Sequence, residues 1–285
     1  MKAPQAHGDD AVTAEVIAVG NELLLGIVQD TNTHWLCTQI TGLGGAVRRA
    51  TLIPDDFSAI AETLSRALDA GRDLIVLTGG LGPTEDDMTM RALGAALDLD
   101  VAERPDALEM IQRRYRELAE ARRVEEKELT PSRRKMARLP EGATPLYNPV
   151  GTAPGALIQR NGSTIVVLPG VPSEMEGIWT ASLQPYLEEI FQSSFYAERH
   201  LVVDVNDESG LAPLLKDVQS EWPQVYVKSR PRSFAEGQII WVTLAMGGDQ
   251  PTVERTLADL AHELMDRLRN AGYPVREADP GEPLR

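Results

Sequence analysis

Residues 77–89, LTGGLGPTEDDMT, constrain the fold of this chain more than any other stretch. A short apolar run, DLIVL, precedes them at 73–77, and apolar residues recur with helical spacing after them at 91–97. This order predicts a strand, then a turn rich in glycine, then a helix.

Three glycines, Gly79, Gly80 and Gly82, make the turn a predicted phosphate site. Glycine has no Cβ and readily adopts φ > 0, so the backbone N–H groups of such a turn can converge on an anion at the start of the next helix. The spacing is neither the dinucleotide fingerprint nor a P-loop, because no Gly-Lys-Ser/Thr follows and the third glycine comes too early.

Three acidic residues, Glu85, Asp86 and Asp87, follow the glycines. Their carboxylates would repel a bound phosphate unless a divalent cation lay between them, and Mg²⁺ is the usual oxygen-liganded choice. The same pattern also suits an acidic N-terminus of the following helix. Both interpretations are open on the sequence alone.

The turn resembles the GG-x-G-x-T-x-x-D signature of the MoaB/MogA-like molybdopterin-binding superfamily. Within it the CinA family, named for competence/damage-inducible protein A, has TGGLGPT-x-DD-x-T, which residues 78–89 match without a gap. Three further segments resemble the same family: AVGNELLLGIVQDTNTHWL at 18–36, NPVGTAPG at 148–155 and LPGVPSEM at 168–175. Four ordered matches within residues 14–187 are more specific than any single motif.

The resemblance implies a MoaB/MogA-like first domain at 13–190, after a polar tail at 1–12. This domain is expected to be a three-layer α/β sandwich with a mostly parallel sheet, and strands alternate with helices from 14 to 94 as that fold requires. A helix at 106–126 is expected outside this alternation, as a flap or an oligomer contact.

A second domain is predicted at 196–275, with a C-terminal tail at 276–285. Its pattern is β-α-β-β-α, with strands at 199–205, 225–229 and 238–246 and helices at 209–222 and 252–270. It is similar to the small α+β domain of CinA-like proteins. Nothing in these residues resembles the nicotinamide-mononucleotide deamidase domain of longer family members, so that activity is not expected.

The candidates for metal binding and water activation are Glu22, Asp86 and Asp87. Glu22 follows the strand at 15–19, at the sheet edge where ligands bind in open α/β sheets. Asp55 is a further candidate metal ligand, although it suits the cap of the helix that opens near residue 57 better. Which carboxylate would act as base is open, because a ligand and a base need the same group.

Other polar residues lie where the predicted turns and helix starts would present them to a ligand. Residues 30–32 precede a helix, so one of them is its cap, and Pro172 suits the first turn of another helix. The loop at 148–155 is either a plain turn or a ligand-lining loop. With the family match, the predicted phosphate and nucleotide contacts are Gly79, Gly80, Gly82, Thr84, Asn21, Asp30, Asn32, Asn148, Gly151, Thr152, Gly170, Pro172, Ser173 and Glu174.

The net charge of −15 argues against a nucleic-acid partner, which would be repelled. One cysteine and four dispersed histidines predict neither a disulfide nor a zinc site. No apolar stretch is long enough for a membrane span and no signal peptide is visible, so we expect a cytoplasmic protein without membrane partners. The basic run at 133–135 is either a solvated helix face or a steering site for anions.

The resemblance implies a metal-dependent nucleotide pyrophosphatase that hydrolyses ADP-ribose to AMP and ribose 5-phosphate, with Mg²⁺ or a similar divalent metal as cofactor. A molybdopterin adenylyltransferase and a non-catalytic nucleotide- or pterin-binding module are the alternatives. Partners are therefore a small nucleotide or pterin phosphate and, because such domains commonly associate, further copies of the chain.

Overall fold

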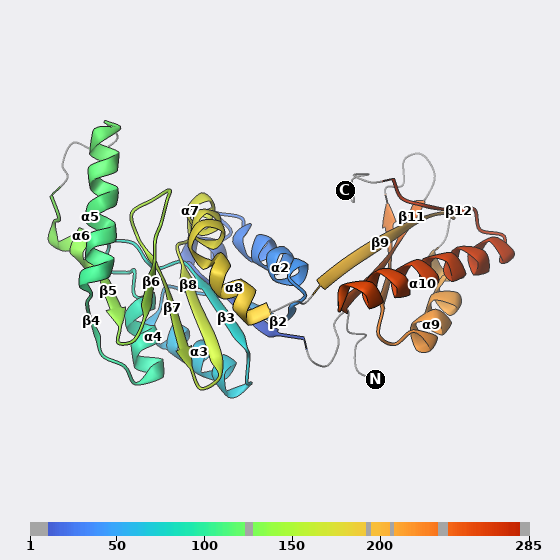
Figure 1. Cartoon of the computed structure of the whole chain (residues 1–285), viewed down its shortest axis with the longest axis horizontal. Helices are drawn as coiled ribbons and strands as arrows, with labels where there is room; N and C mark the ends of the chain where they lie inside the picture. Colours follow the sequence, from blue (N-terminus) through green and yellow to red (C-terminus); the bar gives the residue numbers. More distant parts are fainter. Residues whose placement is uncertain (1–10, 123–127, 192–194, 206–207, 233–238, 280–285) are drawn as a thin grey trace. The chain divides into compact units, whose positions relative to one another are not determined.

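The computed structural model describes residues 11–122, 128–191, 195–205, 208–232 and 239–279. The chain divides into two compact units, a large unit of Val12–Ile40 and Val47–Gln192 and a small unit formed mainly from Ser193 onward (Figure 1). Each unit has its own hydrophobic core. No helix among the described residues is long and apolar enough to cross a membrane.

A six-stranded sheet forms the middle layer of the large unit. Its order is β2 (Ala46–Ile53), β1 (Thr13–Val19), β3 (Leu74–Thr78), β8 (Ser163–Leu168), β7 (Gly155–Arg160) and β6 (Thr144–Leu146). β1, β3 and β8 are parallel neighbours, whereas β7 and β6 continue the sheet antiparallel. All residues of β3 are buried, as expected for a strand covered on both faces.

Helices cover both faces of this sheet. α3 (Phe57–Asp69), α4 (Thr89–Leu97) and α5 (Pro105–Glu120) share a core with alternate strand residues such as Ile17, Ile75 and Ile165. Figure 1 shows α2 (Asn32–Gly42), α7 (Pro172–Ile178) and α8 (Gln184–Phe191) on the other side. A π-helical turn, η1 (Trp179–Leu183), joins α7 to α8, and the Trp179 ring meets Trp35 of α2 edge-on at 5.7 Å. The predicted three-layer sandwich with a mostly parallel sheet is confirmed.

Helix α5 differs from its prediction. It was expected as a flap or an oligomer contact, yet its residues Ala107, Ile111 and Tyr115 belong to the main core of the large unit. It is therefore an integral layer element and not a detached flap, whereas an oligomer contact through its outer face stays a prediction. Further on, β4 (Val101–Glu103) pairs with β5 (Arg138–Pro140), and α6 (Pro131–Lys135) precedes β5.

The small unit has the order β9 (Phe195–Asp204), α9 (Ala212–Glu221), β10 (Tyr226–Arg232), β11 (Ile239–Gly248), α10 (Gln250–Asn270) and β12 (Val275–Glu277). A 3₁₀ turn, η2 (Glu208–Gly210), precedes α9. The strands form one antiparallel sheet in the order β10-β11-β9-β12, with Leu215, Leu260 and their neighbours from the helices in its core. The predicted β-α-β-β-α pattern therefore gains a final strand, β12, where the sequence predicted the start of a tail.

Candidate functional site

The glycine turn, residues 79–88, connects β3 to α4. Gly79 has φ 107° and Gly80 has φ 66°, which confirms that these two positions use the freedom of glycine. Their lack of a side chain also has a packing reason, since a Cβ at Gly79 would lie 2.1 Å from the Val19 carbonyl oxygen and one at Gly80 would lie 2.2 Å from Thr89 Oγ1. The turn is thus packed tightly against β1 and the start of α4.

Asp87 closes the second half of the turn and does not begin a helix. Its Oδ2 accepts hydrogen bonds from the Thr84 N–H at 2.9 Å and the Thr84 hydroxyl at 2.6 Å. Glycine is needed at position 82 because a Cβ added there would lie 2.5 Å from the same carboxylate oxygen. Helix α4 starts only at Thr89 and has no acidic residue in its first turn, so the acidic helix N-terminus is wrong.

Asp86 is exposed beside this closure. Hydrogen bonding to Thr84, more than any other contact, holds the pKa of the Asp86 carboxyl below its ordinary value, and Lys135 adds a weaker attraction. Asp86 is consequently a carboxylate at neutral pH, accessible from solvent.

Lys135, at the end of α6, reaches the turn from outside. Its ammonium donates to the carbonyl oxygen of Thr84, to that of Asp87 at 2.7 Å and to that of Gly82 at 3.5 Å. These contacts show that Lys135 is not a freely solvated side chain, whereas a steering role stays a prediction. Its two neighbours are also engaged, Arg134 with Glu103 and Arg133 over the Tyr115 ring.

The first half of the turn offers hydrogen-bond donors, in contrast to the carbonyl oxygens that Lys135 contacts in the second half. The backbone N–H groups of Gly80, Leu81 and Gly82 have no hydrogen-bond acceptor within the described parts of the chain. All three residues line a cavity of about 910 Å³, which we call the turn cavity. Unpaired N–H groups beside a cavity are the arrangement that binds phosphate.

The turn cavity extends from the glycine turn to α4, α6 and the β4–β5 pair. Its volume lies in the range typical of small-molecule sites. Four basic and four acidic side chains line it, so it is locally neutral in a chain of net charge −15. Apolar groups supply much of the remaining surface, from Phe57, Leu81, Met90, Leu99, Val101 and Met136.

Only part of the predicted site lines this cavity. Gly80, Gly82 and Asp87 do so, with Thr84 and Asp86 adjacent in the chain. The other predicted contacts form separate groups near the ends of β1, β2 and β8.

The first of these groups surrounds Asn32, which is buried. Its Nδ2 donates to Thr78 Oγ1 at 3.2 Å and to the Gly170 carbonyl oxygen at 2.7 Å, while its Oδ1 has no partner in the described structure. Gly170 lies against Gly79, since a Cβ on Gly170 would be 3.4 Å from the Gly79 Cα. Asn32 therefore joins the ends of β3 and β8 and keeps one buried acceptor unused.

The second group comprises the acidic and amide residues after β1 and β2. A four-residue helix, α1 (Asn21–Leu24), places Asn21 and Glu22 at the surface. Asp55 accepts a hydrogen bond from the Asn21 N–H at 2.7 Å, so it does not cap α3; the α3 cap is the neighbouring residue Asp56. Asp30 does cap α2, because its Oδ1 accepts from the Thr33 N–H at 2.9 Å.

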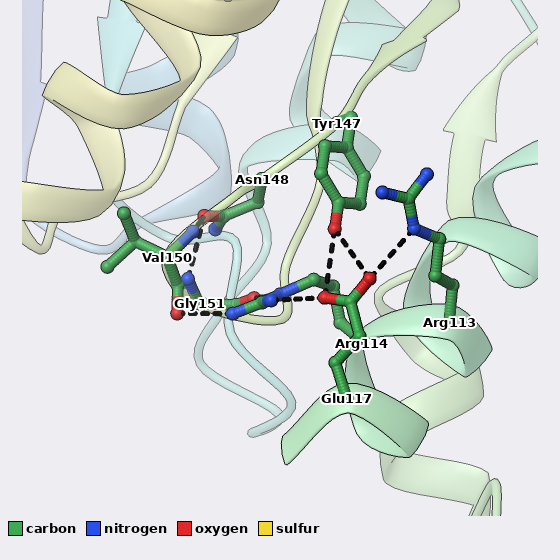
Figure 2. A network of polar contacts seen from close by, with 7 residues as sticks. All are labelled: Arg113, Arg114, Glu117, Tyr147, Asn148, Val150 and Gly151. Atoms are coloured by element: carbon green, nitrogen blue, oxygen red, sulfur yellow. Dashed lines mark hydrogen bonds and ion pairs between the residues drawn. The ribbon is translucent and has the colours of Figure 1, made fainter. Parts of the chain in front are cut away.

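The third group is the loop at 148–152 (Figure 2). Asn148 Nδ2 donates to Ala153 O and Glu174 Oε2, and its Oδ1 accepts from the N–H groups of Val150 and Gly151. All four hydrogen-bonding positions of this amide are thereby used inside the protein. Its structural role is to shape the loop, and a ligand would have to displace one of these bonds.

Arg114 of α5 holds the same loop from the other side. Its Nε donates to the Gly151 carbonyl oxygen at 2.9 Å and its Nη2 to that of Val150 at 2.8 Å. Figure 2 shows Glu117 between Arg114, Arg113 and Tyr147. Hydrogen bonds from Arg113, and next from Arg114, lower the pKa of Glu117 from 4.5 to about 2.

The remaining predicted contacts lie around the start of α7. The helix begins at Pro172 as predicted, and Ser173 is exposed in its first turn. Glu174 packs against Gly151, where a Cβ would lie 1.9 Å from its Oε2. Thr152 is half-buried in the neighbouring loop.

The predicted metal ligands do not form a metal cage. Among the described residues, no group of three or more His, Cys, Asp or Glu side chains lies close enough together to hold a metal ion. Asp87 and Asp55 are engaged in hydrogen bonds with Thr84 and Asn21. What remains compatible with these side chains is an ion held by one or two carboxylates together with ligand phosphates, the usual manner of Mg²⁺.

Sequence reasoning missed the cavity residues contributed by α4 and α6. Arg91 lies with its guanidinium 5.9 Å from the centre of the Phe57 ring, and Ser132, Lys135 and Arg138 also line the cavity. No motif marks these positions. The only signal was the density of basic residues between 104 and 138.

Known proteins resemble this chain in both sequence and fold. Residues 15–189 match the family model described as a probable molybdopterin binding domain. A protein of Aeropyrum pernix is 44% identical over 270 residues, which cover 93% of this chain and 97% of that protein. A protein of Pyrobaculum aerophilum is 43% identical over 258 residues, covering 90% and 94% respectively.

Two solved structures match this chain, and the first of them shares the fold of the large unit. The protein CinA of unknown function from Thermoplasma acidophilum has 39% identity and a TM-score of 0.56, covering 62% of this chain and 98% of that one. The molybdopterin biosynthesis enzyme MoaB from Thermus thermophilus has 21% identity and a TM-score of 0.42, with coverage of 64% and 97%. By the match over residues 15–189, the chain belongs to the family of probable molybdopterin binding domains.

Proposed function

We propose that the large unit binds a phosphate-bearing nucleotide in the turn cavity and hydrolyses its pyrophosphate bond, with ADP-ribose as the substrate. One observation carries the binding part. Gly80, Leu81 and Gly82, whose N–H groups have no acceptor in the described parts of the chain, line a cavity of about 910 Å³. That volume is suited to a nucleotide, and the N–H groups to its diphosphate.

The rest of the cavity suits the organic part of such a ligand. Its apolar wall offers contact area, and the Arg91 guanidinium beside Phe57 adds a cation near the rim. Outside the residues that line the cavity, the unused Oδ1 of Asn32 is an acceptor for a hydroxyl or amino group of a ligand that extends to the β3–β8 edge. A buried acceptor left without a donor is costly, so filling it favours binding.

The chemistry requires water to attack one phosphorus atom while the P–O–P bridge breaks, giving AMP and ribose 5-phosphate. Asp87, which lines the turn cavity, and Asp86 beside it are the proposed carboxylates for receiving the proton of that water. Glu22 is not among the cavity-lining residues, so its proposed part in the chemistry requires a ligand that also reaches the end of β1. A divalent ion such as Mg²⁺, bound with the ligand's diphosphate, would neutralise charge and lower the pKa of a bound water.

Two other functions fit the family equally at the level of fold. A molybdopterin adenylyltransferase would transfer AMP from ATP to a pterin phosphate, and a binding module would hold the ligand without turnover. The similarity of the turn sequence GGLGPT to the CinA family supports the hydrolase, but fold resemblance is weaker evidence for a reaction than for architecture.

The test is incubation of the full chain with ADP-ribose, FAD, NAD and ATP under several divalent metals, followed by chromatography of the products. AMP and ribose 5-phosphate from ADP-ribose support the proposal. Consumption of ATP only when a pterin phosphate is present would establish the transferase, and binding without any product would establish the module.

A cavity-filling variant ties the activity to the turn cavity. Ser132 is exposed on α6 and lines the cavity, so Ser132→Trp should fold and weaken ADP-ribose binding. Ser220→Trp, on α9 in the small unit, is the matched control. Equal affinity in both variants would place the ligand elsewhere.

We also infer that the chain forms a homo-oligomer. After β1 it exposes Leu24, Leu25, Ile27 and Val28, whose exposed fractions are 50–73%. Contiguous exposed apolar side chains of this kind favour association. Light scattering on the full chain measures the molar mass in solution, and Leu25→Glu should lower it by dissociating the oligomer. A wild-type monomer would contradict the inference.

A further inference from the structure

Among the described residues, Lys135 is the one cationic side chain that donates hydrogen bonds to the carbonyl oxygens of the glycine turn. Lysine carries three N–H donors, and here they meet three backbone oxygens of one short segment, those of Gly82, Thr84 and Asp87. Lys135 lies about fifty residues further along the chain, so this contact is tertiary.

Three carbonyl oxygens that converge on one point repel each other unless a cation lies between them. The segment that carries them is neither helix nor strand, and the one backbone hydrogen bond within it runs from the Asp87 N–H to the Thr84 carbonyl oxygen at 3.2 Å. The Thr84–Asp87 hydrogen bonds close it from one side, and Lys135 holds it from the other.

The orientation of these carbonyls also sets the direction of the following N–H groups. In a trans peptide the C=O and the next N–H point in opposite directions, and no described peptide bond is cis. With the Thr84 and Asp87 oxygens directed at Lys135, the N–H groups of Glu85 and Met88 point away from it. Lys135 thereby fixes the directions in which the carbonyl and N–H groups of this segment point.

We propose that Lys135 is a positioning residue, an internal cation that holds residues 82–87 in the arrangement in which the turn receives an anionic ligand. The role in ligand binding rests on the function proposed above. Lys135 contacts the carbonyl oxygens of the turn, so its expected effect is on affinity and on the structure of the turn.

Two other roles of a cation at this position make different predictions. A steering charge attracts the ligand at long range, so removing Lys135 or a neighbouring basic residue should weaken binding to the same extent. High salt screens the attraction, so at high salt neither removal should have an effect. A solvated charge has no effect in any assay. A positioning cation, by contrast, affects the turn even without ligand and at every salt concentration.

The experiment compares Lys135→Met with Arg133→Met in the full chain. Arg133 is on the same helix and carries the same charge, but it does not line the turn cavity, and its contacts include the Tyr115 ring and the Glu128 carbonyl. Two quantities are measured, the affinity for ADP-ribose by calorimetry and, without ligand, the hydrogen exchange of the Thr84 and Asp87 amides, which donate to Asp87 Oδ2 and to the Thr84 carbonyl oxygen.

We expect Lys135→Met to weaken ADP-ribose binding by about tenfold or more and to speed exchange in the turn, while Arg133→Met changes neither by more than about twofold. Ethylammonium, which can enter the space of the lost side chain, should restore slow exchange in Lys135→Met and leave Arg133→Met unchanged. Circular dichroism checks that both variants are folded.

Turn exchange and affinity in Lys135→Met that match those of Arg133→Met at low and high salt would overturn the proposal. If wild type does not bind ADP-ribose but Lys135→Met still loosens the turn and ethylammonium restores it, the positioning role stands and the proposed function fails. If wild type binds ADP-ribose and the turn is unaltered in Lys135→Met, the binding function stands and the positioning role fails.

Discussion

At the scale of single residues, Asp87 has two roles that substitution can separate. Its carboxylate closes the turn through Thr84 and is a proposed participant in hydrolysis. Asparagine keeps an oxygen that can accept from Thr84 but cannot take up the proton of water.

Asp87→Asn should therefore abolish turnover of ADP-ribose while changing the free energy of unfolding by only about 0.5 kcal/mol, because the amide oxygen still accepts from Thr84. Asp87→Ala should lose the turn closure as well, which costs about 1 kcal/mol. Steady-state kinetics and urea unfolding measure the two effects. Turnover that persists in Asp87→Asn would remove Asp87 from the chemistry.

The lowered pKa of Glu117 predicts how the free energy of unfolding depends on pH. Its folded pKa of about 2 lies below its ordinary 4.5, so its stabilising contribution is complete above about 4.5 and is lost as pH falls toward 2. The contribution is small because the side chain is 37% exposed.

The difference in the free energy of unfolding between wild type and Glu117→Gln should accordingly shrink as pH is lowered from about 5 to about 2. Urea unfolding across this range measures it. A difference that is constant with pH would show that the ion pairs of Glu117 with Arg113 and Arg114 do not contribute to stability.

At the scale of elements, α5 supports the loop at 148–152 through one side chain. Arg114, whose side chain is 12% exposed, donates to two loop carbonyls, whereas Arg113, at 60%, bonds Glu117 and lies over the Tyr147 ring. The two neighbours are therefore a matched pair.

Arg114→Gln should destabilise the large unit by about 1–3 kcal/mol and speed amide exchange at Val150 and Gly151, while Arg113→Gln should change exchange there little. Hydrogen exchange followed by mass spectrometry tests this. Equal exchange of the loop in both variants would mean that Asn148 alone maintains it.

Elements with a long periodic pattern were predictable from the sequence. The helix expected at 252–270 is α10 (Gln250–Asn270), and its leucine stripe packs in the small core as expected. β10 runs past its predicted end at 229 to Arg232, because it is an edge strand where Pro231 need not donate to a ladder. α1 and β12 are too short to show a period.

The candidate site was predictable only where chemistry is local in sequence. The turn glycines, Asp30 as a cap and Pro172 as a helix start follow from neighbouring residues. The contacts of Lys135 with the turn and of Arg114 with the loop join residues 36–53 positions apart, and no local pattern announces them. The wall of the turn cavity is likewise built from residues that are far apart in the sequence, from Phe57 to Pro154.

At the scale of the whole molecule, the two units have separate cores and only the large unit carries the proposed site. Leu260→Ala removes a fully buried side chain from the small core, which costs about 2–5 kcal/mol. ADP-ribose stabilises only the unit that binds it.

Scanning calorimetry of the full chain should therefore show that Leu260→Ala lowers one transition and ADP-ribose raises another. The affinity for ADP-ribose should be the same in wild type and in Leu260→Ala. A single transition that responds to both changes would show that the units unfold together.

The central claim is that the glycine turn receives the phosphates of a nucleotide. The most direct measurement is a titration of the ¹⁵N-labelled full chain with ADP-ribose, followed by amide resonances. The account predicts that the amides of Gly80, Leu81 and Gly82 shift in a saturable manner, while those of Gly142 and Gly162, turn glycines of the same unit that do not line the cavity, stay in place. Saturable shifts elsewhere in the large unit with an unchanged Gly80–Gly82 segment would contradict it.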